Sequence, residues 1–303
     1  MTPLFNIDNL ILFFDYVRIT GVFYLPGRNL KAIQALHDGR VVGKGAVNLP
    51  APGLDQDCRF VITFLSGTVD PRQLTLRFEL DNGYTRDVAC ADVLARQQAN
   101  AQQLNHAERG YFDQIKLSGY DRVLEIGSRA RSGVVRRHLF AGKQYTGLDI
   151  LEGPNVDVVG DAHCLTDYFA DESFDAVYSI FTFEHLAMPW KVALELNKVM
   201  RRGAVAYFQT HQALGMHDLP WDFWRYSDTA WNGIFNQSTG FRVLHAYLGQ
   251  PMALVPHIYD EHWIGYEAAA GFAVSAVLVE KTGNSDLRWD LNVREAIQGV
   301  YPA

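Results

Sequence analysis

The run VLEIGS at positions 123–128 decides the fold expected for the second half of the chain. Its apolar residues flank one carboxylate, Glu125, and Gly127 follows directly. Such a run is typical of a buried parallel strand that ends in a tight turn. Open α/β sheets bind ligands beyond the carboxyl ends of such strands. Arg129 and Arg131 stand where a G-x-G-x-G loop carries further glycines, so the run by itself does not identify a nucleotide.

Beyond Gly119 the sequence alternates between short apolar runs, glycine-bearing loops and helix-length segments. This alternation predicts a doubly wound α/β sheet. The strands are predicted at residues 122–125, 144–148, 156–159, 176–180, 204–209, 241–248 and 272–280. The helices are predicted near residues 132–140, 190–200 and 229–235, with the basic cluster around Arg129 and Arg136 at the start of the first one.

Residues 1–90 have a different pattern, in which short β-branched and aromatic runs are separated by turn residues. Asp38-Gly39 and Asn82-Gly83 predict hairpin turns, because these residues tolerate a positive φ. We therefore expect a small all-β, sandwich-like domain over residues 1–90. Residues 91–118 are predicted to form a connecting helix, and residues 119–303 to form the α/β domain.

Composition restricts the function. The 303 residues are 48% hydrophobic and carry a net charge of −7, which favours a soluble protein with no nucleic-acid partner. Cys58, Cys90 and Cys164 lack metal-ligand spacing and suit a reducing cytoplasm. The apolar run at residues 10–14 is interpreted as a strand, and no run approaches the roughly 18 residues of a membrane span.

Acidic side chains recur where the next predicted strands end. Asp149 lies in GLDI (147–150), and Asp161 lies in GDAH (160–163). A carboxylate after the second strand can accept both ribose hydroxyls of an adenosine ligand, and its distance from Gly127 agrees with the roughly 20 residues of a dinucleotide fingerprint. The pair does not separate one adenosine cofactor from another. A turn-forming aspartate is the structural alternative.

SFDAV (173–177) and FEHLAMPW (183–190) complete the ordered set of motifs. From about Gly119 to Lys281 the combined pattern resembles the class I S-adenosylmethionine-dependent methyltransferases. The resemblance implies a seven-stranded Rossmann-like methyltransferase sheet and S-adenosyl-L-methionine as cofactor. It places Glu125 near the methionine ammonium and Asp149 on the ribose. The cofactor-binding residues that it implies are Glu125, Gly127, Ser128, Asp149, Ile150, Asp161, Ala162, Ile180 and Phe181.

Histidines near the ligand edge of the sheet are the candidates for a general base, which a hydroxyl acceptor would need to lose its proton. His185 follows the fourth predicted strand of this domain, and His211 follows the fifth. We predict that one of them is catalytic, with a packing or capping role as the alternative. His163, beside Asp161, is interpreted as a capping or adenine-pocket residue.

The segment after Thr210 mixes aromatic and ionic residues, as a substrate wall would. Its predicted substrate-binding residues are His217, Trp221, Asp222 and Arg225. The run PWDFWRYS (220–227) resembles one in methyltransferases of bacterial glycan biosynthesis. A lid with its own aromatic core and an Asp222–Arg225 pair is the alternative. A metal site built from His211, His217, Asp218 and Asp222 is conceivable by residue type, but no metal is predicted, because these residues have no recognised ligand spacing.

The function predicted is methyl transfer from S-adenosylmethionine to a hydroxyl of a glycan or other small molecule. An NAD-type oxidoreductase is the first alternative, although it lacks the further glycines and has Glu125 where a pyrophosphate would approach. A non-catalytic binding protein on the same fold is the second. The role of residues 1–90 and the question of a homo-oligomer are left open.

Overall fold

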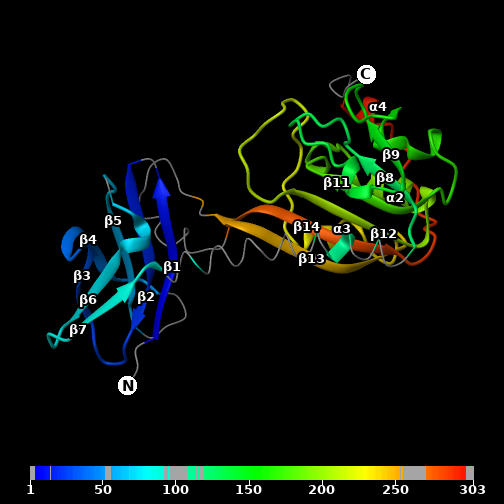
Figure 1. Ribbon diagram of the computed structural model, residues 1–303. Helices are drawn as coiled ribbons and strands as arrows, with labels where there is room; N and C mark the ends of the chain where they lie inside the picture. The colour runs from blue at the N-terminus through cyan, green and yellow to red at the C-terminus, as the bar shows by residue number, and fades with distance from the viewer. Residues whose placement is uncertain are drawn as a thin grey trace. The chain divides into compact units, whose positions relative to one another are not determined.

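The computed structural model describes residues 4–297, apart from 14, 52–55, 68, 92–94, 96–107, 109, 113–114, 116–118, 253 and 255–270. The chain divides into two compact units (Figure 1), one over residues 1–100 and 251–271 and one over residues 101–250 and 272–303. Most of the predicted connecting helix, residues 91–118, lies outside the described residues. The domain limits at 90 and 118 stay a prediction.

The first unit is all-β, as predicted, and its strands form one antiparallel sheet in the order β1-β2-β5-β4-β3-β6-β7. They are β1 (Leu4–Phe13), β2 (Tyr16–Tyr24), β3 (Leu30–His37), β4 (Arg40–Leu49), β5 (Arg59–Leu65), β6 (Thr75–Leu80) and β7 (Thr85–Ala89). The predicted turn between β3 and β4 is confirmed, with φ of 50° at Asp38 and 74° at Gly39. A short 3-10 helix, η1 (Pro71–Gln73), precedes β6.

The two-sheet sandwich expected for this unit is wrong. Four strands separate β1 from β6 in the sheet order, yet the ring centroids of Phe5 and Phe78 are 5.3 Å apart. Phe23 of β2 stacks on the same ring at 4.7 Å. One sheet therefore curls round its own apolar face as a half-barrel, and that face is buried without a second sheet.

The second unit contains a mixed sheet in the order β10-β9-β8-β11-β12-β14-β13. Its strands are β8 (Arg122–Ile126), β9 (Gln144–Asp149), β10 (Val158–Val159), β11 (Phe174–Ile180), β12 (Met200–His211), β13 (Phe241–Met252) and β14 (Gly271–Lys281). Strands β8 to β12 pair in parallel, and β14 runs antiparallel to β12. The α/β fold predicted for this part of the chain is confirmed. Its strand order reverses between β8 and β11, where open sheets of this kind form a ligand crevice.

Both faces of this sheet are covered. Helices α2 (Pro189–Val199) and α3 (Ala230–Ile234) pack on one face, where Trp231 is fully buried. On the other face Tyr111 packs against Tyr178 and Tyr207 and donates a hydrogen bond to the carbonyl of Val177. Helix α4 (Val293–Ile297) lies near the C-terminus. Among the described residues, no helix combines the length and apolar character needed to cross a bilayer.

The helix expected over residues 132–140 is wrong. Only one turn of 3-10 helix forms there, η2 (Arg137–Phe140), because Gly133 adopts a φ of 78° and two β-branched residues follow it. The basic cluster consequently does not lie at the start of an α-helix. Arg137 instead forms an ion pair of 2.6 Å with Asp157 and lies over the ring of Tyr145. The helices predicted at residues 190–200 and 229–235 correspond to α2 and α3.

Asp175 of β11 fastens the beginnings of three neighbouring strands. Its carboxylate accepts hydrogen bonds of 2.9 Å from the backbone N–H groups of Asp121 and Arg122, and it is paired with the side chains of Arg122 and Arg201. Burial disfavours its charge, but the backbone donors and the arginines outweigh that effect and lower the pKa of Asp175. The charged carboxylate therefore contributes to the stability of the sheet.

Replacing Asp175 by asparagine should lower the free energy of unfolding at pH 7 by about 1.5–3 kcal/mol, the range for hydrogen bonds to charged groups. Because the native pKa is lowered, this contribution is complete above the ordinary carboxyl pKa of about 4 and disappears as the pH falls through the native value. Urea denaturation followed by tryptophan fluorescence at pH 7 and at acid pH measures both effects. Exposed Asp286→Asn is the control; an equal loss in both variants would contradict this role.

Candidate active site

A cleft opens at the carboxyl ends of β8, β9, β10 and β11, beside the point at which the strand order reverses. It encloses about 890 Å³, including the space that is open to solvent. Of the residues predicted to bind cofactor or substrate, or to catalyse, these line it: Gly127, Asp149, Ile150, Asp161, Ala162, Phe181, His185 and Trp221. The structure therefore brings these eight predicted residues together around one cleft.

Gly127 forms the floor of the cleft immediately after β8. Its φ of 77° is strained for any residue with a side chain, and a Cβ atom there would lie 1.9 Å from Oγ1 of Thr182. Its N–H donates to the carbonyl of Leu148 at the end of β9. The turn after β8 and the loop after β11 can approach one another only because this residue is glycine.

Asp149 lies at the end of β9 and is held by the loop after β8. Its carboxylate accepts hydrogen bonds from the N–H groups of Arg129 and Leu151, and Nε of Arg129 lies 3.6 Å away. The aliphatic stem of Arg129 packs so closely on Gly153 that a Cβ atom there would lie 2.6 Å from its Cγ. The arginine that replaces a loop glycine therefore positions the predicted ribose-binding carboxylate.

The loop after β8 lines the cleft although Arg129 and Arg131 replace the glycines of a G-x-G-x-G loop. Ala130 adopts a φ of 56°, a conformation usually left to glycine, asparagine or aspartate. Arg131 forms an ion pair with Asp218, and both residues line the cleft. This pair joins the loop after β8 to the segment after β12.

Asp161 caps the 3-10 helix η3 (Ala162–Asp167) by accepting from the N–H of His163. The imidazole of His163 also lies against this carboxylate, with Nδ1 2.7 Å from Oδ1, and its Nε2 accepts from the N–H of Met188. Since Nε2 is an acceptor, Nδ1 is the protonated nitrogen. Burial opposes the charge of Asp161, but the hydrogen bonds from His163 outweigh it and lower the pKa of Asp161. Asp161 is therefore the cap of η3, and His163 is its buried hydrogen-bond partner.

Three residues predicted to bind the cofactor lie outside the cleft lining: Glu125, Ser128 and Ile180. Glu125 is buried on the face of the sheet opposite α2 and α3, and it accepts a hydrogen bond from the hydroxyl of Tyr145. Burial raises the pKa of Glu125, although Tyr145 opposes the change. Ser128 is buried beneath the loop, where a Cβ atom on Gly147 would meet its Oγ at 2.7 Å.

His185 lies on the short 3-10 helix η4 (Phe183–His185), directly after β11, and lines the cleft. Its Nδ1 is 2.8 Å from the carbonyl of Trp221, so Nδ1 donates and Nε2 keeps its lone pair. Nε2 is 3.9 Å from Oδ2 of Asp218, another residue of the cleft, and 3.9 Å from Oε1 of Glu184. Its position and its tautomer both suit a general base.

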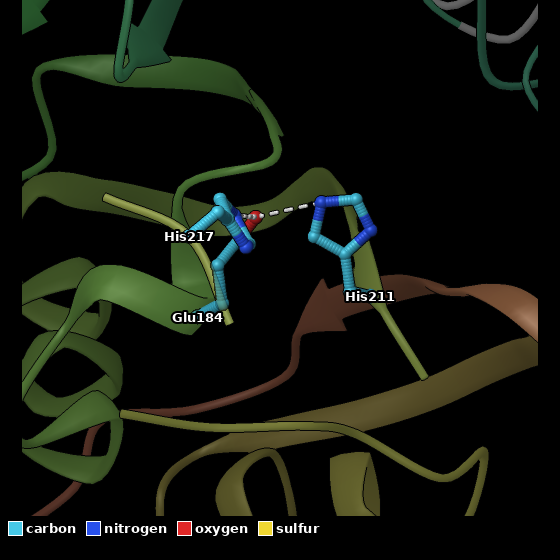
Figure 2. Close-up of side chains that lie close together, drawn as sticks. All are labelled: Glu184, His211 and His217. Carbon is cyan, nitrogen blue, oxygen red and sulfur yellow. Dashed lines mark ion pairs between the residues drawn. The ribbon is translucent and has the colours of Figure 1, made fainter. Parts of the chain in front are cut away.

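The other predicted base, His211, does not line the cleft. It lies at the end of β12, stacks on Phe181 with ring centroids 4.5 Å apart, and directs Nε2 at Glu184 over 3.3 Å (Figure 2). Burial and the neighbouring His217 lower the pKa of His211 to about 4. The carboxyl group of Glu184 has no exposed surface, and this burial raises its pKa.

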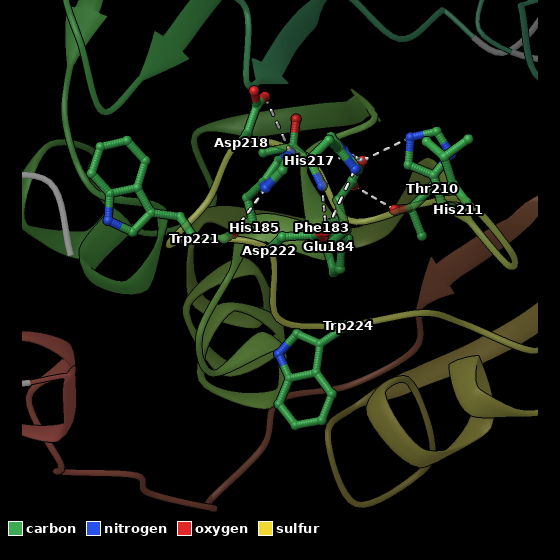
Figure 3. A network of polar contacts seen from close by, with 12 residues as sticks. Phe183, Glu184, His185, Thr210, His211, His217, Asp218, Trp221, Asp222 and Trp224 are labelled. Carbon is green, nitrogen blue, oxygen red and sulfur yellow. Dashed lines mark hydrogen bonds and ion pairs between the residues drawn. The ribbon is translucent and has the colours of Figure 1, made fainter. Parts of the chain in front are cut away.

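Of the four predicted substrate-binding residues, the structure brings only Trp221 to the cleft. Asp222 and Arg225 form a double hydrogen bond of 2.6 and 2.7 Å with one another. Asp222 also accepts from the N–H of His217, and Arg225 donates to the carbonyl of Gly215. Trp224 packs edge-on against Trp190 (Figure 3 shows the segment). Except for Trp221, this arrangement matches the structural alternative for the segment.

Several residues that line the cleft were not predicted to do so: Ile126, Arg129, Ala130, Arg131, Leu148, Leu151, Gly160, Thr182, Leu186 and Asp218. Most of them adjoin a predicted residue along the chain. The only sequence feature that pointed to Asp218 as a cleft residue was its place in the polar segment after β12. Its ion-pair partner Arg131 is 87 positions earlier in the sequence, so no local pattern links the two.

Residues 124–208 match the model of a family described as a methyltransferase domain. The match begins in β8 and ends in β12, so it includes every strand end that forms the cleft. The protein is an S-adenosylmethionine-dependent methyltransferase. This result rejects the NAD-type oxidoreductase alternative. No curated protein sequence matches the chain.

Solved structures similar to this methyltransferase share little sequence with it. A SAM-dependent methyltransferase from Archaeoglobus fulgidus is 18% identical, with 60% of this chain and 94% of that one covered and a TM-score of 0.43. A putative methyltransferase from Bacillus halodurans is 15% identical, with 55% and 94% covered and a TM-score of 0.41. A SAM-dependent methyltransferase from Aquifex aeolicus is 18% identical, with 54% and 82% covered and a TM-score of 0.37.

Replacing Gly127 by alanine should weaken binding of S-adenosylhomocysteine at least about tenfold, equivalent to roughly 1.4 kcal/mol, because the new methyl group must displace Thr182 from the cleft wall. Calorimetric titration measures the affinity. Gly133→Ala is the matched control, since its φ of 78° imposes the same backbone strain and nothing lies within 4 Å of a Cβ atom there.

The double variant Gly127→Ala/Thr182→Gly removes the side chain that the new methyl group meets, so it should recover part of the lost affinity. Equal weakening by Gly127→Ala and Gly133→Ala would show that backbone strain, and not the close approach, matters at Gly127.

Proposed function

We propose that this methyltransferase transfers a methyl group to a hydroxyl oxygen of a glycan or other small molecule, with His185 as the general base. The observation that supports this most directly is the His185 tautomer. The hydrogen bond from Nδ1 to the carbonyl of Trp221 leaves a basic nitrogen on a residue that lines the cleft. A hydroxyl is a weak nucleophile until its proton is removed, so a base at this place has a clear use.

The cleft suits the cofactor by its chemistry. The turn at Gly127 brings backbone close to a ligand, Asp149 offers a carboxylate for ribose hydroxyls, and Ile150, Ala162 and Leu186 offer an apolar surface for an adenine ring. S-adenosylmethionine supplies, when bound, a methyl group that its sulfonium has already activated. The remaining task of the protein is to align the acceptor and to take its proton.

His185 can take that proton at Nε2 while Nδ1 stays bonded to Trp221. Asp218 and Glu184 each place a carboxylate oxygen 3.9 Å from Nε2. The transfer of the proton thus needs no movement of the ring. His211 is less suited to this role, because it lies outside the cleft lining and burial opposes its protonation.

The glycan acceptor is the most specific part of the proposal. It is supported by the resemblance of residues 220–227 to methyltransferases of bacterial glycan biosynthesis and by the ring of Trp221 in the cleft, since aromatic rings cover the apolar faces of sugars. Incubation with isotopically labelled S-adenosylmethionine and a panel of sugar, nucleotide-sugar and phenolic hydroxyl acceptors, with products identified by mass spectrometry, tests it. Labelling of nitrogen or carbon acceptors alone would overturn it. Cytoplasmic location and homo-oligomerisation stay predictions.

Replacing Asp149 by alanine should weaken S-adenosylhomocysteine binding roughly 10–100-fold, which corresponds to losing hydrogen bonds of about 1.5–3 kcal/mol to a charged acceptor. Calorimetry measures the change. Glu152→Ala removes an exposed carboxylate a few residues away on the same loop and should leave the affinity unaltered. If Asp149→Ala bound S-adenosylhomocysteine with unaltered affinity, the assignment of Asp149 to the ribose would be wrong.

Replacing His185 by alanine should lower kcat by roughly 10²–10⁴-fold, the usual contribution of a general base, and should leave the affinity for S-adenosylhomocysteine nearly unchanged. His185→Gln is the companion variant, because its side chain can hydrogen-bond but cannot take a proton at neutral pH. His245→Ala, an exposed histidine on β13, is the control. If His185→Gln kept the full kcat, the general-base role would be excluded.

A further inference from the structure

Three imidazoles surround one oxygen of Glu184 next to the cleft (Figures 2 and 3). From Oε1 of this carboxylate, Nε2 of His211 is 3.3 Å away, and Nε2 of His217 and of His185 are each 3.9 Å away. The three histidines come from η4, from the end of β12 and from the segment after it. The chain thus collects four potential metal ligands from distant positions.

The carboxylate at the centre of this cluster is only half satisfied. Glu184 has no exposed surface, and its Oε2 accepts a hydrogen bond from the hydroxyl of Thr210. Its Oε1 has no hydrogen-bond partner among the residues that the structure describes. A buried polar atom without a partner is costly, and a charged one more so, unless a cation or a donor compensates.

The spacing of the ligand atoms matches a metal site. Ligands about 2.0–2.2 Å from a tetrahedral zinc ion lie roughly 3.3–3.5 Å from one another. The distance from His211 to Glu184 already has this value, and the ligand atoms of Glu184, His211 and His217 all lie within 4.8 Å of one another. A small rotation of the His217 ring would bring the third ligand to the same distance.

The outer hydrogen bonds also prepare these rings for a metal. A ligand histidine usually donates its second N–H to a carbonyl or carboxylate, which fixes the tautomer. Nδ1 of His217 lies 3.1 Å from the carbonyl of Gly215 and 3.5 Å from a carboxylate oxygen of Asp222, and Nδ1 of His185 faces the carbonyl of Trp221. His217 therefore presents an unprotonated Nε2 toward Glu184, whereas Nδ1 of His211, the other proposed ligand ring, is buried without a hydrogen-bond partner among the described residues.

We propose that Oε1 of Glu184 and Nε2 of His211 and His217 bind one divalent transition-metal ion, for which zinc is the best match. Two imidazoles and one carboxylate are the donor set of several catalytic zinc sites, whose fourth position is open. Imidazole ligands disfavour magnesium and calcium, which prefer oxygen. His185, which lines the cleft, has its Nε2 3.9 Å from the same oxygen of Glu184.

A metal at this position would have two effects. It would fasten the segment after β12 to the loop after β11, because its ligands come from both. It would also acidify a hydroxyl group bound at its open position, which would assist the base. The second effect rests on the proposed function, whereas metal binding itself does not.

Metal binding is measurable without any acceptor. The full-length protein is first dialysed against a chelator, and zinc is then titrated in competition with a chromophoric chelator. One equivalent should bind per chain, and cobalt(II) in place of zinc should produce the visible absorption of a four- or five-coordinate nitrogen and oxygen site. Wild-type protein that binds neither ion, or that gives only the spectrum of hydrated cobalt, would overturn the proposal.

Variants distinguish the ligands from their neighbours. His211→Ala and His217→Ala should each abolish the one-equivalent site, and Thr210→Val, which removes the hydroxyl that holds Glu184, should weaken it roughly 10–100-fold. His185→Ala should retain it. The affinity for S-adenosylhomocysteine verifies that each of these variants is folded, because Thr210, His211 and His217 do not line the cleft. Zinc binding that survives His211→Ala/His217→Ala would exclude this site, whatever His185→Ala does to kcat.

Discussion

The close approach of two chain turns, at Gly127 and Thr182, is the constraint on which the cleft depends. The two residues follow neighbouring parallel strands, and there is no room between them for one additional carbon atom. Because the turns meet, the sheet can direct the ends of β8 and β11 toward the same ligand. The residues at the ends of β9 and β10 complete the walls. The helix that the sequence predicted after Gly127 is not needed for this arrangement, and only a single 3-10 turn stands in its place.

Much of the second unit could be predicted because its strands are buried on both faces. Burial makes each strand a mainly apolar run, as in residues 123–126 and 174–180, and such runs are visible in a single sequence. The helix predicted over residues 132–140 failed because composition there is compatible with a helix, while the positive φ of Gly133 keeps the chain from starting one until Arg137. In the first unit the alternating pattern identified strands, but it could not distinguish one curled sheet from two packed sheets. That distinction depends on contacts such as Phe5 with Phe78, which are distant in sequence.

The candidate site shows the same division. Residues directly at strand ends, such as Asp149 and Asp161, were predicted from motifs, and the structure brings them to one cleft. Side chains in the irregular segment after β12 were predicted to contact substrate, but Asp222 and Arg225 bind one another. No local pattern reveals whether two opposite charges three residues apart pair or separate. The grouping of Glu184 with His211 and His217 was invisible for another reason, since its members are spread over three elements and have none of the short spacings that mark a metal motif.

The ion pair between Arg131 and Asp218 joins two loops at the rim of the cleft. Both side chains keep contact with water, with exposed fractions of 63% and 29%, so dissolved salt screens their attraction and the pair adds little to stability. A rim joined by such a weak and solvated bridge can part without disturbing any strand. Separating the two side chains therefore costs little free energy compared with moving the strand ends beneath them.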